Sequence, residues 1–339
     1  MKLEENLPKL RKACFGVQEF PEEVLDWIAE ENLWNIWVPK SHGGLEMSLA
    51  EGLDTLKTLA KADGSLGWTV TLCAGANYFI GNLEPAVAKE IFQNNAEKVC
   101  FGGSGGLFGT AEKQGEHYLV SGVWKYGTGA PYLTHFTLNA KIVEKGKELL
   151  DTDGQPLFRS FVLPKNRVQI IEDWNTMGLK ATATHSFEVQ AVRVHDHYSF
   201  MYNAFHLPQA IYKIPFSTFA DLTLWVNYLG MALHFLEEAQ VILDAKKLDK
   251  LQVLLSGVEQ KIFNCAADIQ EKIDQQIDFT EEHIQEIHRM AADSVQDISH
   301  ALIDIFPTLG VRASRENQPL NQIFKDYFTG TQHYIFAGR

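Results

Sequence analysis

The spacing of hydrophobic positions changes twice along the chain, and the two changes divide it into three parts. Residues 1–97 carry apolar side chains at intervals of three and four, which predicts helices, among them one over about 48–62 and one over about 66–80. The second is apolar nearly all round, so we expect it to be buried. Pro21, followed by two glutamates, indicates the first turn of an earlier helix.

Residues 98–205 alternate with a period near two and are rich in Gly, Val, Tyr and Thr, which predicts short strands separated by turns. The helical period then returns in three long amphipathic segments and a shorter fourth, which suits antiparallel packing. The pattern therefore predicts an α+β fold. It has an N-terminal helical domain (1–97), a middle β-sandwich or barrel domain (98–205) and a C-terminal antiparallel helix bundle (206–339).

Composition narrows the function. The formal net charge is −13, from 43 acidic and 30 basic residues. Nucleic-acid binding needs clustered Lys and Arg, so we expect no nucleic-acid partner. There is no apolar leader and no run of eighteen apolar residues, so we expect a cytoplasmic protein without a membrane partner. No metal site or disulfide framework is expected, because the cysteines lie far apart: Cys14, Cys73, Cys100 and Cys265.

The chain has no stand-alone catalytic motif such as HExxH, GxSxG or a phosphate-binding loop. The glycine-rich segment 102–109 lies among strands, which favours a bulged strand. The segment VSGVWKYGTG (120–129) places Thr128 between Gly127 and Gly129, which lets the backbone approach a flat or bulky group closely. These residues alone leave two interpretations open: a turn without a ligand, or a ligand contact.

Four segments, in this order along the chain, resemble the motifs of the acyl-CoA dehydrogenase superfamily, and the resemblance covers nearly the whole chain. They are FPEEVLDW from Phe20 onward, YLVSGVWKYGTG from Tyr118, EDWNTMGLKATATHSF from Glu172 and NQIFKDYFTGTQHYIF from Asn321. The resemblance implies the helix–sheet–helix fold that the hydrophobic pattern predicts, and it implies a bound flavin.

The resemblance also implies flavin-site residues. Thr128 matches the serine or threonine that lies against the flavin ring near its reactive N5 edge, and Trp124 or Tyr126 would flank the ring. The two glycines would then let the backbone approach it. A second group would lie near the flavin phosphate or ring: Trp174, Thr182, Thr184 and His185. Ser186 stands where the family usually has an aspartate. Trp174 could either cover the flavin or only pack at the junction between sheet and bundle.

The resemblance includes two branches. A true dehydrogenase needs a carboxylate base, but Phe328 and Thr329 stand where the glutamate is expected. Asp326 matches the family's structural aspartate. Glu237 or Glu238, on an earlier helix, is the alternative base, although paired glutamates more often form a solvated face.

The second branch comprises the flavin-dependent monooxygenases, which include two-component hydroxylases supplied with reduced flavin by a separate reductase. Their strand motif resembles SGVWKYGTG more closely. His333 matches their histidine at the reactive edge of the flavin, where an imidazole can donate or accept a proton. Without the resemblance, His333 could equally be an ordinary histidine of a helix with no role at a flavin. The family's arginine segment that reaches a neighbouring subunit's FAD is missing, which favours FMN over FAD, or no flavin.

Three functions follow, in this order. The first is a flavin-dependent oxidoreductase of monooxygenase type, with Thr128 and His333 as catalytic residues and a reductase as partner. The second is an acyl-CoA dehydrogenase with FAD, and the third is a degenerate, non-catalytic member. The substrate is expected to be an apolar or aromatic small molecule, bound by Trp68, Phe79 and Trp225. Wide apolar faces on the bundle predict a homodimer or homotetramer.

Overall fold

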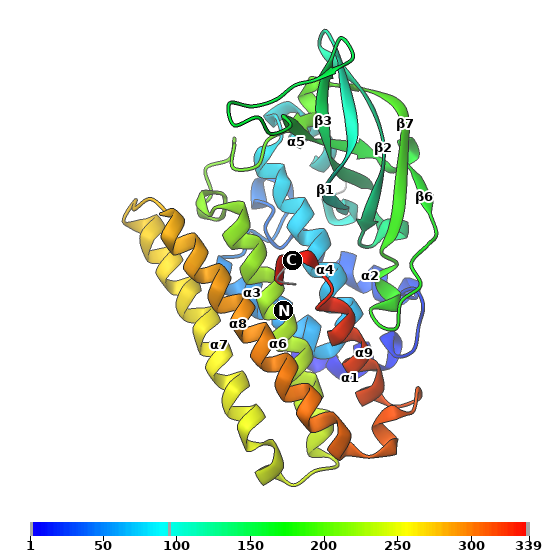
Figure 1. The fold of residues 1–339 in the computed structure, drawn as a ribbon, viewed down its shortest axis with the longest axis vertical. Helices are drawn as coiled ribbons and strands as arrows, with labels where there is room; N and C mark the ends of the chain where they lie inside the picture. Colours follow the sequence, from blue (N-terminus) through cyan, green and yellow to red (C-terminus); the bar gives the residue numbers. More distant parts are fainter. Residues whose placement is uncertain (1–2, 94–95, 337–339) are drawn as a thin grey trace.

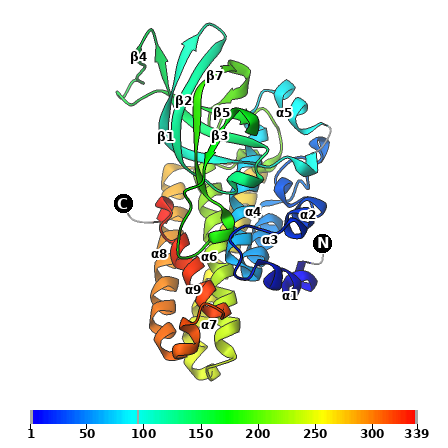
Figure 2. The same ribbon diagram turned by 90° about the vertical axis from the view of Figure 1, so that its right-hand side faces the viewer.

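The sheet occupies one end of the elongated molecule and most helices the other (Figures 1 and 2). Two long helices, α7 (Ala245–Asp274) and α8 (Glu281–Ile305), run along one side. The computed structural model describes residues 3–93 and 96–336. The elements follow the predicted order of helices, strands and helices, so the mixed helix-and-sheet fold is confirmed. The division into three domains stays a prediction. Within the described ranges, no helix combines the length and the apolarity that a membrane crossing requires.

The predicted N-terminal helices are present. The five α-helices of this part are α1 Leu3–Cys14, α2 Glu22–Glu30, α3 Leu49–Ala62, α4 Gly64–Asn77 and α5 Pro85–Phe92. Ser48 caps α3 in a reciprocal capping box with Glu51, and Asp63 caps α4. Helix α4 is buried on nearly all sides, as predicted. Pro21 is the cap of α2 and therefore stands one residue before the predicted helical position.

The strands form one sheet within the described residues. They are β1 Phe101–Gln114, β2 His117–Gly127, β3 His135–Glu144, β4 Lys147–Glu148, β5 Phe158–Pro164, β6 Gln169–Ile171, β7 His185–His195 and β8 Ser199–Phe200. Their order is β6-β7-β2-β1-β3-β5-β8, with β4 paired to β3. β1 and β3 are parallel, and their register shifts between Ser104 and Gly109. The glycine-rich segment is thus a bulged strand, as predicted.

The sheet curls on itself. β7 pairs with β2 near one edge and β8 pairs with β5 at the other, yet only residues 196–198 separate β7 from β8. The four residue steps from His195 to Ser199 span about 14 Å at most, so the two edges must approach each other. The curled sheet is visible in Figure 2. Of the two predicted arrangements, a barrel-like sheet agrees with this topology better than two stacked sheets.

The C-terminal helices surround α6. The helices are α6 Phe216–Gln240, α7 Ala245–Asp274, α8 Glu281–Ile305 and α9 Pro319–Gly330. α6 packs against α3 and α4 on one side and against the other C-terminal helices on the other. A Cβ atom at Gly230 would lie 2.5 Å from the carbonyl oxygen of Lys57, so α3 and α6 approach closely. The N-terminal and C-terminal helices therefore share one packed core.

A loop from the sheet docks on α9. A Cβ atom at Gly178 would lie 2.2 Å from the carbonyl group of Lys325, so only glycine permits this contact between backbones. One residue later, the amide of Leu179 donates to Oδ1 of Asp326 at 2.6 Å. The loop after β6 is thus fixed to the last α-helix by both packing and a buried hydrogen bond.

We expect Gly178→Ala to lower the free energy of unfolding by about 1–3 kcal/mol, because the added methyl group forces two backbone segments apart. Urea unfolding measures this change. Gly257→Ala is the matched control, since Gly257 is exposed on α7 and a methyl group added there would meet no atom within 4 Å. The control should stabilise the protein by up to about 1 kcal/mol. Equal effects at both positions would contradict the tight docking.

Candidate active site

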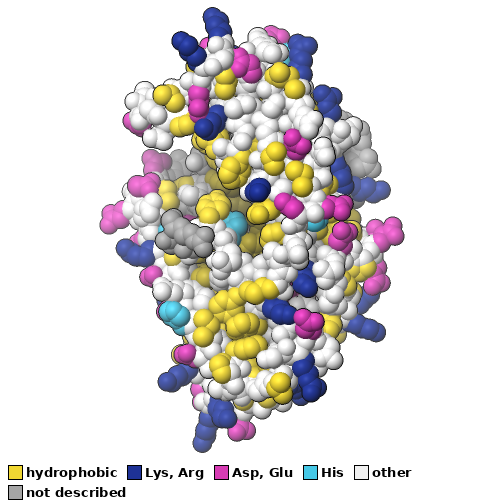
Figure 3. Space-filling view, turned by 45° about the vertical axis from the view of Figure 1, so that its right-hand side comes forward, with side chains coloured by type: hydrophobic (Ala, Val, Ile, Leu, Met, Phe, Trp, Pro, Cys, Tyr) yellow, Lys and Arg dark blue, Asp and Glu magenta, His cyan; other side chains and the backbone are white. Residues whose placement is uncertain are grey.

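A hollow lies between the sheet and the helices, and hydrophobic side chains and a histidine are visible in it (Figure 3). Three parts of the chain meet at α4. Cys73 of α4 donates its thiol to the carbonyl oxygen of Thr128 at 3.7 Å. His333, just after α9, contacts Trp68 of α4 edge-on, with ring centroids 5.7 Å apart. The two predicted catalytic residues are therefore both held against α4.

The hydroxyl group of Thr128 belongs to a chain of hydroxyl groups. Thr182 Oγ1 donates to the carbonyl oxygen of Leu179 at 2.7 Å. Thr184 Oγ1 lies 2.7 Å from Thr182 Oγ1 and 3.2 Å from Thr128 Oγ1. Because Thr182 has only one hydroxyl hydrogen, the hydrogen in its contact with Thr184 comes from Thr184, and the Thr128 oxygen keeps a lone pair for a ligand. The structure thus brings three predicted site residues together.

The two glycines beside Thr128 are required by the protein itself. Gly129 has a left-handed φ of +73°, and a Cβ atom there would lie 3.1 Å from Cys73 Sγ. A Cβ atom at Gly127 would lie 3.2 Å from the ring of Phe187. Contacts with α4 and with the sheet therefore explain both glycines, and the glycines alone do not indicate a ligand.

Trp124 does not lie at the hollow. Its side chain is fully buried, it stacks on Phe187, and its indole N–H donates to the carbonyl oxygen of Asn139 at 2.8 Å. Packing in the interior of the sheet encloses Trp124, and a contact between Trp124 and a flavin stays a prediction. Tyr126 is 44% exposed and contacts Trp174 edge-on at 5.6 Å. Tyr126 is the other residue that the sequence analysis named as a possible neighbour of the flavin ring.

The loop before β7 is held by its own polar contacts. The Trp174 amide donates to Nδ1 of His185 at 3.0 Å, so Nδ1 is the unprotonated nitrogen of a neutral ring. Ser186, which replaces the family's aspartate, donates to Asp173 from its amide and its hydroxyl at 2.8 and 2.6 Å. The carboxylate of Asp173 thus lies beside Ser186, which itself has no carboxylate. Sequence matching missed Asp173 because it lies thirteen residues earlier.

His333 is half-buried beside Trp68, and burial lowers its pKa to about 4. The ring is therefore neutral at pH 7. Its Nδ1 accepts a long hydrogen bond of 3.5 Å from the amide of Ile335, which leaves the Nε2 hydrogen as a donor. This arrangement suits a hydrogen-bond donor better than a group that gains a proton at neutral pH.

The predicted substrate residues are only partly brought together. Trp68 contacts both His333 and Tyr228. Phe79 lies in another aromatic cluster, against Phe200, Tyr202 and Phe216. Trp225 is fully buried in α6. Substrate contacts of Phe79 and Trp225 stay predictions, and the structure places neither beside His333.

The structure adds further residues near His333 that the sequence did not indicate. Tyr228 donates its hydroxyl to the carbonyl oxygen of Gly330 at 2.6 Å, and its ring contacts Phe336. His288 lies 3.0 Å from buried Asp221 and packs against Phe336. These residues come from α6, from α8 and from the chain after α9, so no local spacing in the sequence brings them together.

Glu237, an alternative base in the sequence, forms ion pairs with Arg11 and Lys61, each at 2.6 Å. It therefore ties α6 to α1 and α3, and its candidacy as a catalytic base is corrected. Glu238 lies beside it, with its carboxylate 3.9 Å from Nε2 of His234.

Two buried carboxyl groups support the loop–helix contact. Asp326 accepts from the Leu179 amide, while Gln322 donates to Asp63 at 2.8 Å. Burial raises the pKa of both aspartates, and the charge of Asp63 further raises the pKa of Asp326. At least one of the two carboxyl groups therefore keeps its proton in the folded protein above the pH at which an exposed aspartate ionises.

Known proteins share this fold. The chain is 31% identical to an indole-3-acetate monooxygenase of Acinetobacter baumannii over 245 residues, which is 69% of this chain and 60% of that protein. It is 22% identical to the flavin-dependent monooxygenase oxygenase subunit HsaA of Rhodococcus jostii, over 68% of this chain and 62% of that protein. The matched part thus spans about 60% of these curated relatives' length. No protein-family profile matches the chain.

Solved structures match over nearly the whole chain. The HsaA monooxygenase from M. tuberculosis superimposes with a TM-score of 0.90 at 18% identity, over 98% of this chain and 92% of that chain. XiaF from Streptomyces sp., in complex with FADH2 and glycerol, gives 0.87 at 18% identity, over 98% and 90%. TdsC from Paenibacillus sp., in complex with FMN and indole, gives 0.81 at 18% identity, over 99% and 93%. The chain therefore has the fold of these three proteins.

The aspartate pair predicts a pH dependence of stability. Below about pH 4 both aspartates are protonated in folded and unfolded chains alike. As the pH rises further, the unfolded chain loses these protons first, because the folded pKa values are raised, so the free energy of unfolding falls. We expect Asp326→Asn to reduce this fall, since asparagine keeps the acceptor for Leu179 without ionising.

Urea unfolding between about pH 4.5 and 8 measures the slope. Asp249→Asn, at an exposed position on α7, controls for the loss of one carboxylate. The same slope in wild type and Asp326→Asn would show that the buried pair does not titrate as described.

Proposed function

We propose that this chain is the oxygenase component of a two-component flavin-dependent monooxygenase, which hydroxylates an aromatic small molecule. A separate reductase would deliver the reduced flavin. The observation that carries the proposal is that α4 contacts both the segment of Thr128, with its hydroxyl group, and the neutral imidazole of His333. The fold is shared with XiaF and TdsC, whose structures hold FADH2 and FMN.

The residues present suit a flavin. The Tyr126–Trp174 corner offers apolar surface to an aromatic ring system, and Thr128 offers a hydroxyl group that can form a hydrogen bond. A reduced flavin bound here would supply the electrons that activate dioxygen. Thr128 would orient the ring, and His333 would donate a hydrogen bond from Nε2 to the reacting oxygen. The aromatic side chains of Trp68, Tyr228 and Phe336 would exclude water and contact the substrate.

The structure offers less support for acyl-CoA dehydrogenation. That reaction needs an accessible carboxylate to remove a proton, and residues 327–336 contain none. Asp326 is buried and bound to the Leu179 amide, and Glu237 is paired with two cations. A neutral imidazole and a hydroxyl group remain, which fits oxygen chemistry better.

The proposal includes a flavin cofactor and an aromatic class of substrate. Either FMN or FAD agrees with the fold, and the missing arginine segment favours FMN. The aromatic side chains around His333 and the relatives' names point to an aromatic substrate, with indole and indole-3-acetate as first probes. Assembly into a homodimer or homotetramer through the bundle remains part of the proposal.

Flavin binding tests the cofactor part. We expect purified protein to bind reduced FMN anaerobically, and Thr128→Ala to weaken this binding about three- to tenfold, because one hydrogen bond contributes about 0.5–1.5 kcal/mol. Thr308→Ala, on the exposed turn after α8, is the control. Failure to bind FMN or FAD in either redox state would refute the proposal. Bleaching of bound FAD by an acyl-CoA would instead support a dehydrogenase.

Single-turnover hydroxylation tests the role of His333. Protein with reduced FMN and indole is mixed with oxygenated buffer, and the products are separated by chromatography. We expect His333→Asn to bind reduced FMN within about twofold of wild type and to lower product yield by about a hundredfold or more. His42→Asn, in the short turn that precedes α3, is the control. Full product yield from His333→Asn would remove His333 from the mechanism.

A further inference from the structure

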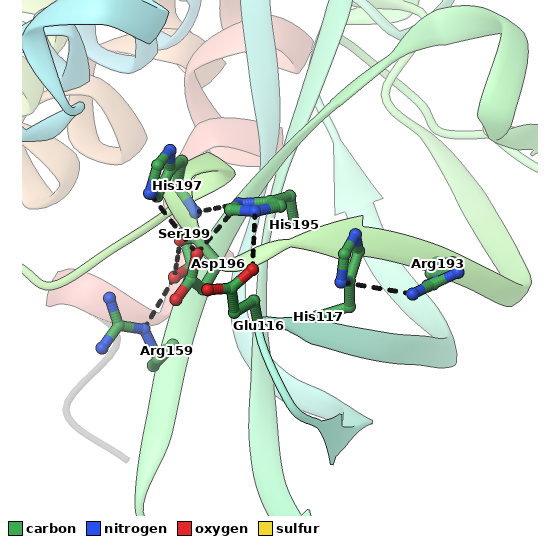
Figure 4. Close-up of polar contacts among 8 residues, drawn as sticks. All are labelled: Glu116, His117, Arg159, Arg193, His195, Asp196, His197 and Ser199. Atoms are coloured by element: carbon green, nitrogen blue, oxygen red, sulfur yellow. Dashed lines mark hydrogen bonds and ion pairs between the residues drawn. The ribbon is translucent and has the colours of Figure 1, made fainter.

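Two imidazoles flank a carboxylate at the turn that joins β7 to β8 (Figure 4). Oδ1 of Asp196 lies 2.9 Å from Nδ1 of His195 and 3.8 Å from Nε2 of His197. One ligand-type atom from each of the three side chains falls within 4.8 Å of the others. Because a metal ion needs converging ligand atoms, this spacing allows all three to reach one ion after small side-chain rotations.

Two acceptor atoms face each other in this cluster. The amide of His197 donates to Nδ1 of His195 at 3.3 Å, so that nitrogen carries a lone pair and no proton. Oδ1 of Asp196 is buried and has no hydrogen-bond partner. Two lone-pair atoms 2.9 Å apart repel each other unless a cation or a proton lies nearby. A metal ion would satisfy both atoms and replace the long amide contact.

The surroundings fit a metal-binding histidine. Oε2 of Glu116 lies 4.0 Å from Nε2 of His195, on the opposite side of the ring from Asp196. Histidines that bind a metal through one nitrogen commonly direct the other N–H toward a carboxylate, which fixes the ring. The His117 ring packs edge-on against His195 at 4.8 Å and lies 3.4 Å from the guanidinium of Arg193. Glu116 and His117 therefore limit how far His195 can turn.

The turn itself is held in place. Ser199 Oγ donates to the carbonyl oxygen of Asp196 at 2.6 Å, and Nε of Arg159 donates to Ser199 Oγ at 2.8 Å (Figure 4). The backbone between the two histidines is thus fixed by β5 and β8 before any ion binds. A preformed backbone lowers the entropic cost of assembling a site.

We propose that His195, Asp196 and His197 bind a divalent transition-metal ion of the zinc type, with Glu116 positioning His195. Two imidazole nitrogens and one carboxylate oxygen suit Zn²⁺, Co²⁺ or Ni²⁺ better than Mg²⁺ or Ca²⁺, which prefer oxygen ligands. Water would complete the coordination, since 62% of the His197 side chain is exposed. The expectation of no metal site rested on cysteine spacing alone and did not consider this cluster.

The position of the cluster indicates a stabilising role. β7 has eleven residues, so His195 lies about 30 Å from His185 at the other end of the strand. The ion would therefore not contact the candidate flavin site. It would bridge residues around the turn between β7 and β8. Because a ligand that binds only the folded state raises the unfolding temperature, the ion would stabilise this part of the sheet.

Titration of tag-free, chelator-treated full-length protein with ZnCl₂ by calorimetry, and with CoCl₂ by visible absorption, tests the proposal. We expect one equivalent of tightly bound ion and a rise in unfolding temperature with Zn²⁺. His197→Ala and Asp196→Asn should each weaken binding by at least about tenfold, and Glu116→Gln by about tenfold.

His283→Ala is the matched control, because His283 forms an isolated 3.0 Å pair with Asp268 on other helices, and its affinity for Zn²⁺ should equal that of wild type. Circular dichroism confirms that each variant is folded. Absence of one-equivalent binding in wild type overturns the proposal, and so does equal affinity in wild type and His197→Ala. The latter result would place the ion elsewhere.

Discussion

The contact between Asp326 and the Leu179 amide connects the two halves of the candidate site. Thr182 donates to the carbonyl oxygen of Leu179 and lies in the hydroxyl chain that reaches Thr128. Asp326 lies on α9, and the chain after α9 carries His333. One buried hydrogen bond therefore links the segment of Thr128 to the helix before His333, and both residues also contact α4 through their segments.

This connection has a cost in free energy. Two carboxyl groups, Asp63 and Asp326, lie in the interior, where an ionised carboxylate is strongly disfavoured. Hydrogen bonds from the amides of Leu66 and Leu179 and from Gln322 offset part of this cost. A hydrophobic pair would not fix the loop in one direction, whereas a carboxyl oxygen accepts an amide at one angle. The arrangement exchanges some stability for a defined position of the loop.

The sequence predicted most of the fold, because burial alternates regularly along most elements. It predicted α3 and α4 to within a few residues at each end and identified the bulged strand. It did not decide between Trp124 and Tyr126. The register of β2 against β7 shifts between Trp124 and Gly127, so counting alternate residues no longer tells which side chain points inward.

The contacts that organise the candidate site join residues far apart in the sequence, such as Asp326 and Leu179, which are 147 positions apart. No local spacing can indicate such pairs. The family resemblance predicted Thr128 and His333 as site residues because it matches positions along the chain and does not depend on local chemistry.

Burial also sets the chemical character of the hollow. It lowers the pKa of His333 to about 4, so this ring is uncharged at neutral pH, and it raises the pKa of Asp326, which disfavours a charge there. Thr128 contributes a hydroxyl group. A site made of neutral hydrogen-bond donors and aromatic rings stabilises developing negative charge on a bound group by preorganised dipoles rather than by a fixed cation. Such a site needs no carboxylate base, which is consistent with the absence of one between Tyr327 and Phe336.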